Sequence, residues 1–221
     1  MPAGHRYAAV LLLAVATVVF LVVAPDRAGS RAVALLLAGA MLLVVVVTSG
    51  SRLRVRRRAA GALVLGTALL ALAVAVDAVA GWVGSLVAGL LLLVTLGQLV
   101  VGLVRLLREQ GVTPQAVAGA VAIYLLLGVA FALAIGVGAR LDDGPWFAQG
   151  TDGTTSDQLY FSFTALTTTG FGDLSAGTRG GRALTVLEML TGQIYLVTVI
   201  ALLVGNLRRR EAPRPSRSTP R

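Results

Sequence analysis

The chain of 221 residues is 57% hydrophobic and only 13% charged, whereas about a quarter of the residues in soluble domains are charged. This composition predicts a membrane protein. The absence of cysteine excludes disulfides and thiolate metal sites, and the single histidine, His5, argues against a histidine metal site or a Ser-His-Asp triad. The net charge of +9 comes from arginine alone. These arginines lie at the ends of apolar segments, which indicates contact with anionic lipid headgroups rather than with nucleic acid.

Six apolar stretches are close to the roughly 17–25 residues that a helix needs to cross a bilayer. Their ranges are 7–24, 32–48, 60–80, 83–104, 116–138 and 183–205. Gly81 and Trp82 predict a tight turn between the third and fourth stretches, and Pro114 predicts the start of the fifth helix. A cleaved signal peptide is the alternative for residues 1–24, although the apolar run is long for one and no clear cleavage site follows.

The arginines also predict the orientation in the membrane. Fourteen of the 19 fall on one side of the six stretches, including the cluster "SRLRVRRR" at 51–58, and five fall on the other side. The positive-inside rule makes the arginine-rich side cytoplasmic, with both termini inside, and we expect the plasma membrane.

Residues 139–182 differ from the rest of the chain. They begin with a polar, turn-rich segment and continue with "LYFSFTALT", which is apolar but too short to span a bilayer. We expect a short helix near 156–167, capped by Ser156 or Asp157, that enters the membrane and returns through "TTTGFGD". Non-helical backbone at membrane depth is tolerated only inside protein or along water, so this segment predicts symmetric association of several copies.

The segment "YFSFTALTTTGFGDL" resembles the pore module of the potassium-channel superfamily. The family signature, close to T-x-G-[Y/F]-G-D, is matched by residues 168–173, and the resemblance covers roughly residues 115–206. It implies an all-α membrane protein with six transmembrane helices, a re-entrant pore helix and a selectivity-filter loop, assembled as a homotetramer. Four copies of the loop would surround K⁺ ions with rings of backbone carbonyls; no other cofactor is expected.

The resemblance assigns roles to individual residues. The filter that binds K⁺ is expected at Thr168, Thr169, Gly170, Phe171 and Gly172. Thr169 and Phe171 stand where valine and tyrosine are common in the family, so we expect weaker bracing of the filter there. Filter support is expected from Asp173, Thr167, Thr164 and Glu188, with Thr164 or Thr167 as hydrogen-bond partner of Glu188. A plain turn is the alternative for Asp173, and a place at the outer interface is the alternative for Glu188.

A gating hinge is expected at Gly192, with Thr191, Ile194 and Tyr195 near the cavity below the filter. Glycine also lets transmembrane helices approach one another, so close packing is an equal alternative for Gly192.

We expect three regions: a four-span domain at 1–110, a pore domain at 111–207 and a basic, disordered cytoplasmic tail at 208–221. The first region resembles a voltage sensor in its number of spans only, because the fourth stretch carries no charge before Arg105. Without gating charges it cannot sense voltage in the usual way. No domain for a soluble ligand is expected.

The sequence therefore predicts a potassium-selective channel, and not an enzyme. A weakly selective cation channel is the first alternative. A potassium transporter subunit is a second, although the chain has one filter motif instead of four fused repeats. An intramembrane enzyme would need a catalytic dyad, for which the chain has few residues.

Overall fold

The computed structural model describes residues 4–48, 53–79, 81–141 and 143–211. Within these ranges the chain is helical, and its only β pairings are two isolated bridges that involve Phe147. The helices are α1 (Gly4–Val23), α2 (Ala28–Thr48), α3 (Leu53–Ala75), α4 (Gly81–Gln110), α5 (Pro114–Leu141), α6 (Thr155–Leu166) and α7 (Arg179–Glu211). The predicted all-α class is confirmed.

The six long helices follow the six predicted stretches, with shifted ends. Helix α3 ends at Ala75 and α4 already begins at Gly81, so the turn predicted at Gly81 and Trp82 is wrong and lies before them. Helix α5 begins at Pro114 as predicted. Helices α4 and α7 continue past their apolar stretches to Gln110 and Glu211, because arginine and glutamate are good helix formers outside a membrane as well. The first residues of the predicted disordered tail are therefore helical, and residues 212–221 lie outside the described chain.

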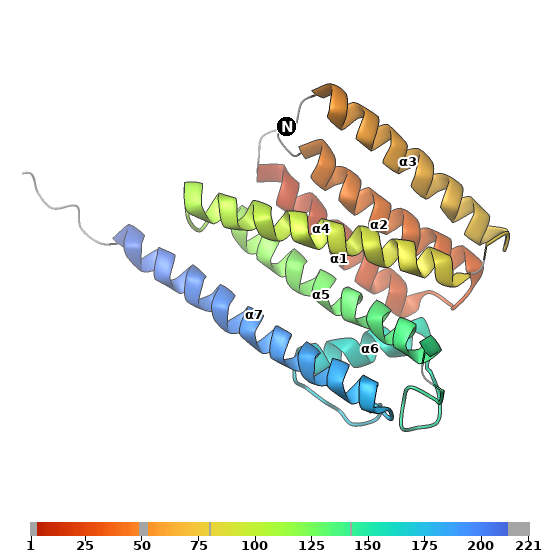
Figure 1. Ribbon diagram of the computed structural model, residues 1–221. Helices are drawn as coiled ribbons and strands as arrows, with labels where there is room; N and C mark the ends of the chain where they lie inside the picture. The colour runs from red at the N-terminus through yellow and green to blue at the C-terminus, as the bar shows by residue number, and fades with distance from the viewer. Residues whose placement is uncertain (1–3, 49–52, 80, 142, 212–221) are drawn as a thin grey trace, which may run out of the picture.

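Successive long helices run antiparallel, so the start of α1 and the end of α7 lie at the same end of the molecule (Figure 1). Helix α2 packs against α3 and α4, while α1 and α4 pack against α5. The main core joins α1, α2, α4 and α5 through residues such as Val10, Met41, Leu99 and Leu126. Helix α3 is the most peripheral, since its contacts are mainly with α2.

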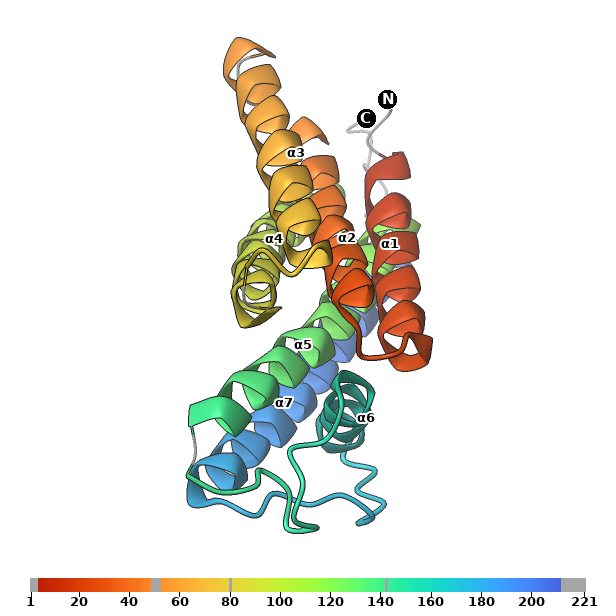
Figure 2. The ribbon, with the colours of Figure 1, turned by 90° about the vertical axis from the view of Figure 1, so that its right-hand side faces the viewer.

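The short helix α6 lies at the other end of the molecule, against α5, α1 and α7 (Figure 2). A separate cluster of the aromatic residues Trp146, Phe147 and Phe161 packs with Ile135 of α5. The rings of Phe147 and Phe161 meet edge to face with centroids 5.3 Å apart. This cluster anchors the loop before α6 to the body of the helix bundle.

The outward faces of the long helices are apolar. Leu12, Leu69 and Leu90 are each more than half exposed. So large an apolar surface is unfavourable in water and favourable in contact with lipid. Among the described residues, three helical segments are long and apolar enough to cross a membrane: Ala28–Val47, Val83–Gln110 and Pro114–Leu141. Shorter apolar segments occur at Tyr7–Val23 and Ala60–Ala75. The chain has membrane-crossing helices, and six spans remain a prediction.

Candidate ion-conduction site

Helix α6 begins with a capping box. Thr154 is the N-cap, its side chain accepts a hydrogen bond from the Asp157 backbone N–H, and the Asp157 carboxylate accepts from the Thr154 N–H at 2.8 Å. The predicted caps Ser156 and Asp157 are therefore wrong as caps, because both lie inside the first turn. Asp157 instead closes the box from the third position, which satisfies N–H groups that would otherwise lack partners.

The loop after α6 is held by the last turn of that helix. The Thr168 N–H donates to the Ala165 carbonyl at 2.9 Å, and the carbonyl of Thr164 accepts from the N–H groups of Thr169 and Gly170 at 2.9 and 3.2 Å. Thr164 thus supports the predicted filter through its backbone, while its hydroxyl bonds to Phe161 in its own helix. Three donors from the loop fold it back onto the end of α6.

Backbone dihedrals alternate along the predicted filter. Thr168, Gly170 and Gly172 have φ of +56°, +54° and +83°, whereas Thr169 and Phe171 between them do not have positive φ. In an extended strand successive carbonyls point to opposite sides, and a switch of handedness at every second residue turns them toward the same side. Glycine adopts such dihedrals at little cost, but the β-branched Thr168 is a genuine outlier. Strain of this kind is typical of functional segments.

Side-chain contacts within the loop and with α6 hold the loop in its conformation. The hydroxyls of Thr167 and Thr169 lie 2.8 Å apart, so the Thr169 hydroxyl has the partner that the sequence required. The ring of Phe171 stacks on Tyr160 of α6 with centroids 6.2 Å apart. Asp173 ends this exposed loop, and its support of the filter remains a prediction.

The whole loop from Thr167 to Asp173 is exposed on the single chain. Beside it, α7 carries an exposed apolar stripe spaced at three and four residues: Val186, Leu190, Ile194 and Val197. A polar loop and an apolar stripe on one open face would both gain from contact with further copies of the chain.

Glu188 lies in the packed interior, since its exposed fraction is 0%. Its carboxyl group contacts the Ser162 hydroxyl of α6 at 2.5 Å. The predicted partners Thr164 and Thr167 are wrong, because their hydroxyls turn back to carbonyls of their own helix. The depth of Glu188 in the membrane, and with it the alternative place at the outer interface, remains a prediction.

Gly192 is a packing position in this structure. A Cβ there would overlap the carbonyl oxygen of Leu166 at the end of α6, and α7 runs through the position without a break. The Thr191 hydroxyl bonds within its helix and Ile194 is 65% exposed, whereas Tyr195 turns away from the open face and donates to the Ala120 carbonyl of α5 at 2.6 Å. Bending at Gly192 remains a prediction.

Two functional candidates were not predicted from the sequence. Gln193 of α7 donates from Nε2 to the Thr168 hydroxyl at 3.0 Å, and Ser162 links α6 to both α5 and α7. An amide inside an apolar stretch is a signal for Gln193, since polar side chains in membrane helices are costly unless used. Serine gives no comparable signal, because it is common in helices of every kind.

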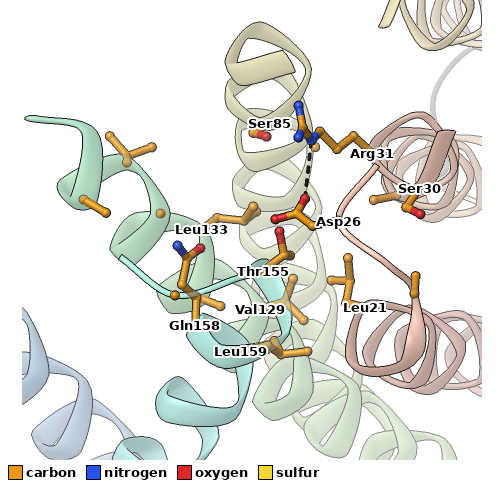
Figure 3. Close-up of a pocket in the computed structure, with 18 of the residues that line it drawn as sticks. Leu21, Asp26, Ser30, Arg31, Ser85, Val129, Leu133, Thr155, Gln158 and Leu159 are labelled. Atoms are coloured by element: carbon orange, nitrogen blue, oxygen red, sulfur yellow. Dashed lines mark ion pairs between the residues drawn. The ribbon is translucent and has the colours of Figure 1, made fainter. Parts of the chain in front are cut away.

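A cavity of about 220 Å³ lies between α1, α2 and α4 on one side and α5–α6 on the other. Figure 3 shows Asp26 and Arg31 at one wall, paired at 3.5 Å, and Thr155 and Gln158 of α6 at the other. Next to it the Ser156 hydroxyl donates to the Val22 carbonyl of α1 at 2.9 Å. Helix α1 therefore contacts the start of α6 directly.

Residues 119–209 match the family described as "Ion channel". Over this segment the chain is similar to that ion-channel family. The match begins in α5 and ends in α7, so it contains α6 and the loop with alternating dihedrals. The predicted resemblance to the potassium-channel superfamily is confirmed, as is ion-channel function at this general level. No curated protein and no solved structure matches the chain.

The ion-channel segment excludes the first four helices. Their role has to be argued from this chain alone, and their contacts with α5 and α6 are the relevant observation.

Proposed function

We propose that four copies of the chain form a K⁺-selective channel whose filter is Thr168–Gly172. The observation that carries the proposal is the alternation of positive φ at Thr168, Gly170 and Gly172 in a loop that is exposed on the single chain. Such a loop presents carbonyl oxygens to one side. Four of them around an axis replace the hydration shell of a dehydrated cation.

Fourfold assembly is supported by the free-energy cost of exposing the loop of a single chain to lipid. Unpaired backbone groups facing lipid cost several kcal/mol each, whereas around a shared axis they face ions and water. The α7 stripe of Val186, Leu190, Ile194 and Val197 supplies an apolar contact surface for neighbouring copies. The C-terminal end of α6 precedes the filter, and its partial negative charge favours a cation below it.

The filter residues support selectivity for K⁺, with weaker bracing at two positions. Phe171 keeps the aromatic stack on Tyr160 and lacks a hydroxyl of its own. This difference favours a second candidate, a weakly selective cation channel with the same architecture. A transporter subunit fits less well, because one chain contributes a single filter.

The test is ion flux through the full-length protein reconstituted into liposomes. We expect K⁺ efflux that greatly exceeds Na⁺ efflux under equal gradients. Equal fluxes would establish the weakly selective channel, and no flux of either ion together with a monomeric protein would refute both candidates. Gly172→Ala is the control for the pathway, since a Cβ at φ +83° disrupts the filter without changing a side-chain charge.

The first four helices act in this proposal as a membrane scaffold for the pore. Among their described residues, α4 carries no charge before Arg105, so the work of moving charge through the membrane field is not available to it. The proposed setting is the plasma membrane, with both termini in the cytoplasm and arginines on anionic headgroups. Steep gating charge in bilayer recordings would overturn the scaffold role.

A further inference from the structure

Behind the filter, one hydroxyl lies between two acceptors. Ser162 Oγ of α6 is 2.7 Å from the Gly128 carbonyl oxygen of α5 and 2.5 Å from Glu188 Oε1 of α7. A serine hydroxyl has one hydrogen and can donate to one of these oxygens at a time. If Glu188 were an ionised carboxylate, which is an acceptor only, one of the two short contacts would lack a proton.

A proton on Glu188 supplies the missing hydrogen for the second contact. The carboxylic O–H donates to Ser162 Oγ, and the Ser162 hydroxyl donates to Gly128, so each short contact contains one hydrogen. The second carboxyl oxygen, Oε2, is buried without a hydrogen-bond partner. As the carbonyl oxygen of a neutral acid this is a modest cost, whereas as part of a buried charge it would be a large one.

In the described ranges, no charged group near Glu188 is paired with it, so none would compensate an ionised carboxylate there. The ionisable residues on the three packed helices whose side chains the structure describes are Tyr124 and Arg140 of α5, Asp157 and Tyr160 of α6, and Arg179, Arg182 and Tyr195 of α7. None of them forms an ion pair or hydrogen bond with Glu188; the ion pair found within the described chain joins Asp26 and Arg31. Because Glu188 is 0% exposed in the single chain, a neighbouring copy or a lipid cannot reach it unless its own helices move.

We propose that Glu188, as a neutral carboxylic acid, is a positioning residue that clamps α6 between α5 and α7 through the relay Glu188–Ser162–Gly128. The relay fixes the middle of α6, one turn or less from Thr164, whose carbonyl holds the N–H groups of Thr169 and Gly170. The aromatic ring of Phe163 packs directly onto Gly128 beside it. A shift of α6 along either neighbour would therefore move the carbonyl that sets the filter backbone.

Glutamine is the diagnostic substitution. The Glu188→Gln amide has the shape of the acid, carries no charge and can donate to Ser162. Glu188→Ala and Ser162→Ala each interrupt the relay and leave a buried group without its partner. Thr185→Val is the matched control on α7, because the Thr185 hydroxyl bonds only to Gly181 within its own helix.

The first measurement is infrared spectroscopy of the purified full-length protein at neutral pH. We expect a carbonyl band of a protonated carboxyl group that disappears in Glu188→Gln. Carboxylate bands in its place, or no difference between the two proteins, would overturn the proposal. This readout is independent of conduction, so it can succeed even if the proposed channel activity fails.

The second measurement is thermal stability and the K⁺ to Na⁺ flux ratio in liposomes. We expect Glu188→Gln and Thr185→Val to stay within about twofold of the parent ratio. Ser162→Ala and Glu188→Ala should lower it by roughly five- to tenfold, since each leaves a buried polar group unsatisfied. If Glu188→Gln fails to fold, or is as impaired as Glu188→Ala, the neutral acid is refuted.

Discussion

At the scale of single residues, Thr168 is the position where the chain departs most from ordinary geometry. Its φ of +56° is unfavourable for a β-branched residue, and a conformation of this kind costs on the order of 1–3 kcal/mol. The Thr168 N–H is held by Ala165 and its hydroxyl by Gln193. These two bonds explain how the innermost predicted ion ligand keeps its conformation.

Gln193→Leu should therefore weaken selectivity. The substitution removes the donor to Thr168, and a neutral hydrogen bond contributes about 0.5–1.5 kcal/mol, so we expect the K⁺ to Na⁺ permeability ratio to fall about two- to tenfold. Bilayer recordings of the reconstituted protein measure the ratio, with Thr185→Val as control. An unchanged ratio would mean that the Gln193 bond does not hold Thr168.

Phe171→Tyr should have the opposite effect and strengthen selectivity. Phe171 is 69% exposed and its ring stacks on Tyr160, so an added hydroxyl has room. We expect a slower decline of K⁺ current and a higher permeability ratio, and a faster decline in Phe171→Leu, which loses the stack. The time course of single-channel activity provides the test; equal time courses in all three proteins would count against a bracing role.

At the scale of elements, α6 depends on its surroundings. A helix of 12 residues is marginal by itself. Its start is held by the capping box at Thr154 and by the contact of Ser156 with α1, and its middle by the contact of Ser162 with α5. The Ser156 contact links α1 to the proposed pore segment, which gives this helix a structural role that needs no sensor charge.

Thr154→Ala should loosen the start of α6. Loss of an N-cap threonine costs typically about 1 kcal/mol, so we expect a lower unfolding temperature followed by circular dichroism, and a reduced K⁺ current. Thr154→Ser keeps the capping oxygen and should behave as the parent. A serine variant as unstable as the alanine variant would show that packing of the methyl group, and not the cap, matters at this position.

At the scale of the whole molecule, the open face formed by the loop and α7 is the surface through which we propose that copies of the chain assemble. Polar backbone from Thr167 to Asp173 and the apolar stripe on α7 lie side by side on it. Binding of K⁺ only in the assembled state would stabilise that state by RT ln(1 + [K⁺]/Kd), about 2.7 kcal/mol at a hundredfold excess over Kd.

Gly170→Ala should reduce this K⁺-dependent stability. A Cβ at φ +54° meets no neighbour but adds dihedral strain of about 1–2 kcal/mol in every chain, which a fourfold assembly multiplies. Native mass spectrometry after heating with and without K⁺ measures the tetramer fraction.

Gly111→Ala is the matched control for that experiment. Gly111 has φ +71° and open space around it, but it lies in the α4–α5 connection. It should lower stability equally with and without K⁺. A similar response to K⁺ in both variants would contradict a filter at Gly170.

The sequence alone determined the class of the protein and the place of its candidate ion site. Long apolar runs can only satisfy their backbone as helices in lipid, and the glycine spacing of "TTTGFGD" is local information, so both could be read without a structure. The start of α5 at Pro114 was equally local.

Tertiary structure decided which side chains support that site. Glu188 bonds to Ser162 and not to Thr164 or Thr167 because the rotation of α7 against α6 selects its neighbour. Gly192 packs on Leu166, Tyr195 turns to α5, and Gln193 reaches Thr168 for the same reason. These contacts join residues that lie tens of positions apart in the sequence. They depend on the crossing angle and rotation of packed helices, which the hydrophobic periodicity of either helix does not determine.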